Sequence, residues 1–328
     1  MRVCLEINDA FETMTTTSSS EQILSEAAYF VMQKASFNAP KALKLVMEGF
    51  PISKGDRGEF LVLLLLTLAR DTTVGAADEF GRPITGRRWF GLTNFLYGQT
   101  FRKQTVPSRL VDANSIRALD MLSKDFPNAQ LHFSHFVKVH EHRAIALQAL
   151  LLLQGRGAAV LYATNQIGVD AINVFLKDGT TLVRDNAGLV LQQIKTNSSY
   201  SNKPDQALFD AMNPYELGIL KKGAPAIPLI KIVFALAEKT ASLTVVRHDA
   251  TTNYAAVVYE IWCAGISPHI LTPIVQQEVG IWHALLQASY GWRELYKTMS
   301  DVTDDLRRSA FPGVARDAGH YSRWARLL

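Results

Sequence analysis

The sequence predicts an α/β protein in which a mixed β-sheet is flanked by helices. Short runs rich in apolar and β-branched residues, bounded by turn residues, occupy 158–164, 169–177 and 189–196. Segments with apolar residues at helical spacing precede these runs, and further helical segments lie between and after the later strands. This order of elements is typical of a sheet covered by helices.

The composition is that of a globular protein. The chain has 328 residues, of which 48% are hydrophobic and 20% charged, so it is long enough to bury a substantial core. The net charge of +4 is a weak basic bias that does not by itself indicate nucleic acid. Two cysteines, Cys4 and Cys263, cannot build a disulfide framework and are not spaced like zinc ligands. A reducing compartment is therefore expected.

No targeting segment is recognisable. The N-terminus lacks the basic and apolar regions of a signal peptide. The longest apolar run, residues 60–69, is shorter than the roughly 20 residues that a bilayer-spanning helix needs. We therefore expect a soluble intracellular protein, in the cytoplasm or nucleus, without a membrane partner.

The N-terminal part is expected to be flexible and then helical. Residues 1–20 end in a Thr/Ser run without apolar side chains, which indicates a flexible segment. Helices are expected over 21–35, 40–49 and 57–70. The third is apolar almost all round, which is typical of a helix buried on most faces at the centre of a domain.

An insertion is expected at about 72–156, with helices over 112–125 and 141–154 and a basic segment before them. Residues 81–111 contain no acidic residue. The basic and aromatic residues that we select there as nucleic-acid-binding candidates are Arg82, Arg87, Arg88, Trp89, Arg102 and Lys103. Basic side chains contact phosphates and aromatic rings stack on unpaired bases. The alternative is a partly buried insertion whose aromatic residues pack on the main domain and whose arginines are solvated.

The C-terminal half continues the sheet. We expect a short helix and three further strands, at 205–212, 227–235, 243–247 and 254–261. The nuclease-like domain inferred below is expected to span 21–265. Residues 266–328 are expected to form a helical C-terminal extension.

Polar residues interrupt two strands that otherwise look buried. Asp170 stands near the start of 169–177, and Gln193 and Lys195 share one face near the end of 189–196 because side chains alternate along a strand. A hairpin places these strands side by side, and Gly168 permits a sharp turn before the carboxylate. Oxygen ligands of this kind suit Mg²⁺.

This pattern resembles the PD-(D/E)XK nuclease superfamily, whose core is a helix, three antiparallel strands, a helix and a strand. Asp170 matches the motif's Asp, and Gln193-Ile194-Lys195 matches its (Glu/Gln)-x-Lys triplet. Glu59 matches the acidic residue that the first core helix often adds. The insertion after that helix and Val169, where Pro is usual, depart from the superfamily pattern.

The resemblance implies a restriction-endonuclease-like core and metal-dependent hydrolysis of phosphodiester bonds in DNA or RNA. Mg²⁺ or Mn²⁺ would be held by Asp170, Glu59, the Gln193 amide and the Ile194 carbonyl. Lys195 would orient the attacking water and offset the phosphate charge. Gln193 in place of Glu removes one negative charge, which is expected to weaken metal affinity.

More narrowly, segments 54–59, 164–195 and 259–268 resemble a group of fungal proteins related to Crinkler-type effectors. In that group such a domain is often joined to an NTPase module. The sequence has no Gly-x-x-x-x-Gly-Lys-Ser/Thr loop, so the resemblance implies the nuclease-like part alone, with an NTPase or another protein as a partner.

Each of these assignments has an alternative. Gln193 and Lys195 also suit the polar face of an edge strand, and Glu59 also suits a capping box with Asp56. The rival to catalysis is a nuclease-like effector or binding module that recognises nucleic acid or protein without cutting.

Overall fold

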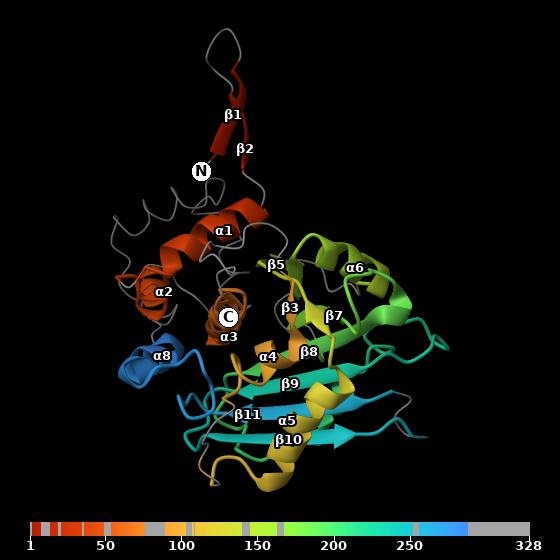
Figure 1. Ribbon diagram of the computed structural model, residues 1–328. Helices are drawn as coiled ribbons and strands as arrows, with labels where there is room; N and C mark the ends of the chain where they lie inside the picture. The colour runs from red at the N-terminus through yellow and green to blue at the C-terminus, as the bar shows by residue number, and fades with distance from the viewer. Residues whose placement is uncertain are drawn as a thin grey trace, which may run out of the picture.

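The structure is a computed structural model that describes residues 2–7, 14–18, 21–34, 36–48, 54–75, 89–102, 107, 109–139, 145–162, 167–251 and 256–287. Over these residues the fold is mixed α/β, with a nine-stranded sheet flanked by helices (Figure 1). The predicted fold class is confirmed at this level. Among the described residues, no helix combines the length and apolar character needed to cross a bilayer.

The main sheet is mixed. Its strands are β3 (Phe90–Gly91), β4 (Gln130–Leu131), β5 (His135–Lys138), β6 (Ala158–Leu161), β7 (Ala171–Leu176), β8 (Ala187–Lys195), β9 (Leu229–Ala235), β10 (Ser242–His248) and β11 (Val258–Ala264). The order runs β10-β11-β9-β8-β7, and beyond β7 both β4 and β6 pair with it. β6, β7 and β8 are successively antiparallel, whereas β8, β9 and β11 are parallel to one another. β5 lies parallel to β6, β3 lies antiparallel to β4, and β10 lies antiparallel to β11.

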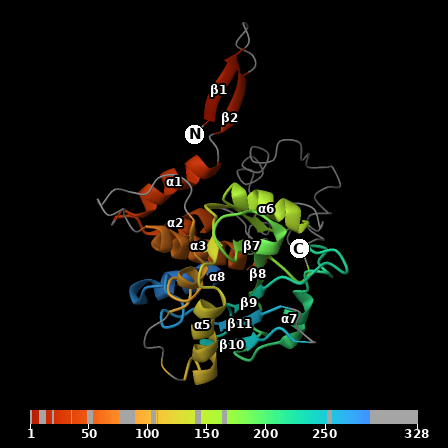
Figure 2. The same ribbon diagram turned by 45° about the vertical axis from the view of Figure 1, so that its right-hand side comes forward.

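Helices cover both faces of the sheet. They are α1 (Glu21–Met32), α2 (Ala39–Glu48), α3 (Lys54–Val74), α4 (Leu92–Leu96), α5 (Ala113–Asp125), α6 (Leu147–Gly155), α7 (Gln206–Ala211) and α8 (Val279–Gln287), with short 3₁₀ turns η1 (Arg184–Asn186) and η2 (Gln276–Glu278). Helices α2, α3, α4, α5 and α8 contribute buried side chains to the core on one face, and α6 and α7 to the core on the other. In Figures 1 and 2, α8 lies beside α2 and α3.

The two cores follow from side-chain alternation in the central strands. In β8, Val190 and Ile194 face the core beneath α3, whereas Leu189 and Leu191 face the core beneath α6 and α7. Helix α3 is buried along much of its length, as its all-round apolar sequence predicts. Trp282 and other residues after 265 belong to the core beneath α3.

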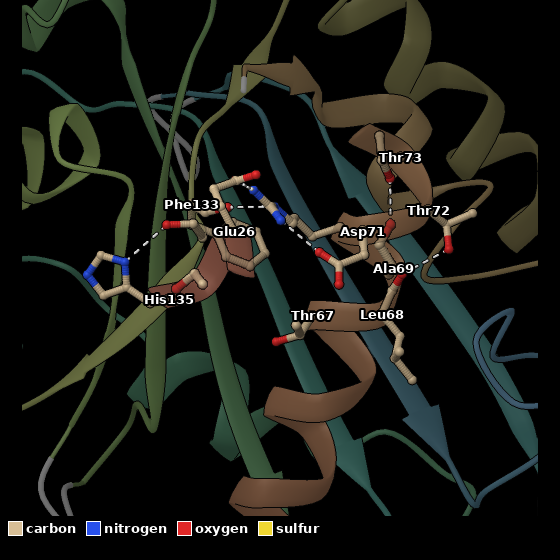
Figure 3. A network of polar contacts seen from close by, with 12 residues as sticks. Glu26, Thr67, Leu68, Ala69, Asp71, Thr72, Thr73, Phe133 and His135 are labelled. Atoms are coloured by element: carbon tan, nitrogen blue, oxygen red, sulfur yellow. Dashed lines mark hydrogen bonds and ion pairs between the residues drawn. The ribbon is translucent and has the colours of Figure 1, made fainter. Parts of the chain in front are cut away.

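A buried arginine ties α3 to its neighbours. Arg70 Nε donates to the Phe133 carbonyl over 3.1 Å, and its terminal nitrogens donate to Asp71 over 2.7 Å and to Glu26 of α1 over 3.1 Å (Figure 3). Because a buried guanidinium is stable only when its charge and donors are satisfied, these contacts hold α1, α3 and the chain before β5 in one arrangement.

Two parts differ from the sequence predictions. β1 (Arg2–Ile7) and β2 (Met14–Ser18) pair antiparallel and project beyond α1, where a flexible segment was predicted (Figures 1 and 2). The β-branched run at Thr15, Thr16 and Thr17 favours extended backbone, which the prediction overlooked. The insertion also supplies the strands β3, β4 and β5, which were not predicted. Strands of two to four residues are too short to show a periodic pattern in the sequence.

A buried charge network docks α7 on the sheet. Lys231 and Glu260 lie in register on β9 and β11, with Nζ 3.6 Å from Oε1. Lys231 Nζ also donates to the Phe209 carbonyl of α7 over 2.7 Å. Gln206 of α7 donates to the Glu260 carboxylate, which also contacts His248 Nε2 at 3.1 Å. Burial lowers the pKa of Lys231, and the Glu260 charge opposes that effect.

Lys231→Met is expected to lower the free energy of unfolding by about 3 kcal/mol, because Glu260 would stay buried without its cation. Urea denaturation measures the change. The double variant Lys231→Met/Glu260→Met should recover most of the loss, since no uncompensated charge remains. A double variant as unstable as the single one would contradict this account.

Candidate functional site

The candidate site lies where β8 continues past the end of β7. The β7–β8 pairing begins at Ala171 opposite Gln192, while residues 193–195 of β8 pair with β9 on their other side. Asp170 directly precedes β7, and its main-chain N–H still donates to the Gln192 carbonyl over 2.8 Å. The two strands therefore separate at Asp170, and the last three residues of β8 lie beyond that point.

The Asp170 carboxylate closes the gap between the strands. Its Oδ2 accepts a hydrogen bond from the Ile194 main-chain N–H over 2.5 Å. The side chain thus takes the place of the main-chain acceptor that β7 no longer provides. Burial raises the pKa of Asp170, and the Ile194 hydrogen bond and the Lys195 charge oppose that rise. Asp170 is therefore attached to β8 and electrostatically linked to Lys195.

Gly168 shapes the approach to Asp170. Its φ of +84° lies in the left-handed region that side-chain-bearing residues rarely adopt. A Cβ at this position would lie 2.4 Å from the Ala211 carbonyl oxygen at the end of α7. The sharp turn expected from the sequence is present, and only glycine fits it.

Gln193 and Lys195 lie on an interior strand, because β8 runs between β7 and β9. At residues 193–195, however, only β9 still pairs with it, so this end of β8 is an edge on its β7 side. Gln193 is 4% exposed, and its Oε1 has no hydrogen-bond partner in the described part of the chain. Leaving a buried acceptor unpaired costs about 1–3 kcal/mol. Lys195, at the end of β8, holds its Nζ 5.8 Å from the centre of the Tyr200 ring.

Glu59 adds a second carboxylate from α3. Its pKa is raised to about 7: burial is the largest cause, the Lys138 charge opposes the rise, and the charges of Asp170 and Asp56 add to it. Its Oε2 lies 3.8 Å from Lys138 Nζ. The capping-box interpretation is wrong, because α3 begins at Lys54 and Asp56 already lies within its first turn.

A close contact brings α3 to the end of β8. A Cβ added at Gly58 would lie 2.2 Å from Thr196 Cγ2 and 3.2 Å from Ile194 Cγ2. The absence of a side chain at Gly58 therefore lets the first turns of the helix approach the strand directly. Because Glu59 is the next residue, this approach determines how near its carboxylate comes to Asp170.

Glu59, Asp170, Gln193 and Lys195 thus lie near one end of β8 but not on one face of it. Ile194 and Thr196 point toward α3 and Glu59, so Gln193 and Lys195 point to the opposite face, beneath α6 and α7. Ile194 contributes its main-chain N–H to Asp170, and its carbonyl as a ligand stays a prediction. The sequence analysis missed Lys138. It is the last residue of the four-residue strand β5, whose length shows no strand signal, and it meets Glu59 only through the tertiary fold.

The donor atoms fit a hard divalent cation. Two carboxylates and an unpaired buried amide oxygen are ligands that Mg²⁺ accepts. Within the described residues, no three or more His, Cys, Asp and Glu side chains are grouped as metal ligands. Gln193 and Glu59 lie on opposite faces of β8, so a cation bound by Asp170 would take one of them and not both.

The basic segment is described only in part. Arg82, Arg87, Arg88 and Lys103, selected as nucleic-acid-binding candidates, lie outside the described residues. The Trp89 ring packs on the His132 ring with centroids 4.9 Å apart, and Arg102 Nε donates to the Pro268 carbonyl over 2.7 Å. For Trp89 and Arg102, the structure therefore shows the packing expected of a partly buried insertion.

Comparisons with known proteins identify no relative of this chain. No protein-family model matches the sequence, and neither a curated protein nor a solved structure is significantly similar to the chain. The function is therefore inferred from the residues and geometry of the site itself.

Glu59→Gln is expected to stabilise the protein at alkaline pH. Between pH values near 4.5 and 7 the folded protein keeps a proton on Glu59 that the unfolded chain has lost. The free energy of unfolding therefore falls as pH rises through this window. The variant removes the ionisation, so at about pH 8 it should gain about 1–3 kcal/mol and at about pH 5 almost nothing.

Urea denaturation at the two pH values measures this difference. Glu216→Gln, which neutralises an exposed carboxylate, is the matched control and should respond little at either pH. A gain for Glu59→Gln that is equal at both pH values would show that the carboxyl is not buried in the charged cluster described above.

Gly58→Ala is expected to destabilise the protein by about 1–3 kcal/mol, because the new methyl group overlaps Thr196 Cγ2. Helix propensity alone predicts the opposite sign, since Ala is better than Gly by about 1 kcal/mol in a helix. Thr196→Ser removes the overlapping methyl group, so adding Gly58→Ala to that variant should be close to neutral. Thermal and urea unfolding of all four proteins tests the coupling.

Proposed function

We propose that this protein is a metal-dependent nuclease-like phosphodiesterase that acts on DNA or RNA inside the cell. The observation that carries the proposal is the buried, unpaired amide oxygen of Gln193 at the end of β8. It lies one residue from the amide that binds Asp170 and shares its strand face with Lys195. An unpaired oxygen on the same strand face as a lysine, one residue from the point where Asp170 is bonded to β8, suits a cation and a phosphate.

The strand order supports a restriction-endonuclease-like core. β6, β7 and β8 form an antiparallel series, α7 follows, and β9 lies parallel to β8. Helix α3 precedes them along the chain and packs on β8. This is the order of helix, three antiparallel strands, helix and strand that the sequence resemblance implies. Asp170 stands at the start of the second of these strands and Lys195 at the end of the third.

Different residues of the site would have different chemical roles. Asp170 and the Gln193 amide would hold Mg²⁺ or Mn²⁺, and Glu59 would act on Asp170 from the α3 face of the sheet. The cation would supply charge stabilisation for the phosphate and a more nucleophilic water. Lys195 would bind a phosphate oxygen and orient the attacking water at the end of β8. Burial of both carboxylates strengthens these electrostatic effects, because the local dielectric is lower than that of water.

Purified protein with Mg²⁺ or Mn²⁺ is expected to cleave plasmid DNA or structured RNA, and EDTA should stop the reaction. Lys195→Ala should lower the rate by about 100-fold or more, because it removes a charge that stabilises the transition state. Lys177→Ala is the control, since Lys177 is exposed just beyond the other end of β7. Thermal unfolding should show that both variants keep the fold.

The result that contradicts catalysis is an absence of cleavage by the wild-type protein with either metal. Salt-sensitive binding of DNA or RNA under those conditions would instead identify a nuclease-like module that recognises nucleic acid without cutting it.

A further inference from the structure

Arg57, in the first turn of α3, carries a buried charge that has no carboxylate partner in the part of the chain that the structure describes. The residue is 2% exposed. Burial lowers its pKa, and no neighbouring carboxylate opposes that effect. A guanidinium buried in this way is costly, because it has left water without gaining an opposite charge.

One long hydrogen bond holds the guanidinium. Arg57 Nη1 donates to the Leu286 carbonyl, in the last turn of α8, over 3.4 Å. The C-terminal end of a helix carries a partial negative charge, which favours a cation but does not replace a full counter-charge. Arg57 Nε is buried without an acceptor, and Nη2 makes no hydrogen bond to a described group. The edge of the guanidinium that these two nitrogens form is therefore unpaired.

Arg70 of the same helix shows how a buried arginine is compensated in this fold. It is also 2% exposed, but each of its three nitrogens donates a hydrogen bond. The acceptors are the Phe133 carbonyl and the carboxylates of Asp71 and Glu26. Arg57 is buried to the same extent and has neither carboxylate. The two arginines thus differ in their partners and not in their burial.

A second donor without an acceptor lies on the same side of α8 as Leu286. Trp282 precedes Leu286 by one helical turn, so the two residues share a face of the helix. Trp282 is fully buried in the core beneath α3, and its Nε1 has no acceptor among the described residues. Helices α3 and α8 pack on each other. Unpaired N–H donors without a nearby carboxylate suit an oxyanion and exclude a metal ion as their ligand.

We propose that Arg57 binds a small phosphate-bearing ligand where the first turn of α3 meets the last turn of α8. Nε and Nη2 form the planar edge of arginine that donates two parallel hydrogen bonds to one oxyanion. A phosphate group carries about 1.5–2 negative charges and three acceptor oxygens, so it compensates the guanidinium and still accepts from a further donor. The N-terminal end of α3 adds a dipole that favours negative charge.

Burial decides the size of the ligand. A residue that is 2% exposed offers no open surface to a nucleic-acid backbone, whereas free phosphate or the phosphate of a mononucleotide is small enough to enter between two helices. The ligand forms and breaks no covalent bond there. The inference is independent of the proposed function, because Arg57 belongs to α3 whereas Gln193 and Lys195 point to the opposite face of the sheet.

Thermal unfolding with and without inorganic phosphate tests the proposal. The melting temperature is measured for the wild-type protein, Arg57→Met and Arg57→Lys in HEPES buffer, with NaCl added to keep the ionic strength constant. Arg117→Met, which removes an exposed arginine from α5, is the matched control. This control is needed because phosphate also stabilises folded proteins without binding to a site. Titration calorimetry measures phosphate binding directly.

Phosphate should stabilise only the proteins that keep the arginine. At about 50 mM phosphate the melting temperature of the wild-type protein and of Arg117→Met should rise by about 2–5 °C more than that of Arg57→Met. Arg57→Lys should bind phosphate about 10-fold more weakly, because lysine keeps the charge but lacks the planar edge. Without phosphate, Arg57→Met should melt at or above the wild-type temperature, since an uncompensated buried charge is gone.

Two results overturn the inference. In the first, Arg57→Met gains as much from phosphate as the wild-type protein. In the second, Arg57→Met melts well below the wild-type protein or fails to fold in phosphate-free buffer, which would show that the guanidinium is compensated within the protein.

A parallel titration with adenosine 5′-monophosphate distinguishes the two sources of the phosphate group. A response of the wild-type protein to the nucleotide that is lost in Arg57→Met supports a nucleotide ligand. A response of the same kind to inorganic phosphate alone supports the free anion. Cleavage by the proposed nuclease site is not a readout of either titration, so its success or failure leaves this test unaffected.

Discussion

The hydrogen bond from the Ile194 amide to the Asp170 carboxylate holds the end of the sheet on which the candidate site depends. Upstream of this bond, β7 and β8 are joined by main-chain pairing, and beyond it β8 continues beside β9. If the carboxylate were absent, the Ile194 N–H would be a buried donor without an acceptor. The same group therefore completes the sheet and provides a negative charge at the point where the strands separate. Gln193 and Lys195 take their positions from this arrangement.

Two carboxyl groups, those of Glu59 and Asp170, are buried near this hydrogen bond. Burial raises the pKa of both Glu59 and Asp170, and the charge of Asp170 raises the pKa of Glu59 further. Two other buried charges have close partners of opposite sign, since Lys231 is paired with Glu260 and Arg70 with Asp71 and Glu26. At the end of β8, by contrast, the Lys138–Glu59 contact is 3.8 Å long, beyond hydrogen-bond distance. Strained electrostatics of this kind is typical of sites that bind ligands.

Much of the architecture follows from local patterns. The helix over 57–70, the strands near 169–177 and 189–196, and the cap at Asp205 all appear close to their predicted positions. Their signals are strong because apolar periodicity and capping residues act over a few neighbouring positions. The ribbon of β1 and β2 and the short strand β5 escaped prediction. Both depend on pairing with a partner strand, and β5 is in addition too short to show a strand pattern of its own.

The sequence by itself determined which chemical groups the site can use, namely Asp170, Gln193 and Lys195, because strand alternation and the polar interruption of buried runs are visible in one dimension. Only the tertiary structure decided the environment of those groups. It placed β8 between β7 and β9, left the Gln193 oxygen without a partner among the described residues, raised the pKa of Glu59 to about 7, and brought Lys138 from the insertion to Glu59. Burial and charge coupling depend on distances between residues far apart along the chain, and no local pattern encodes those distances.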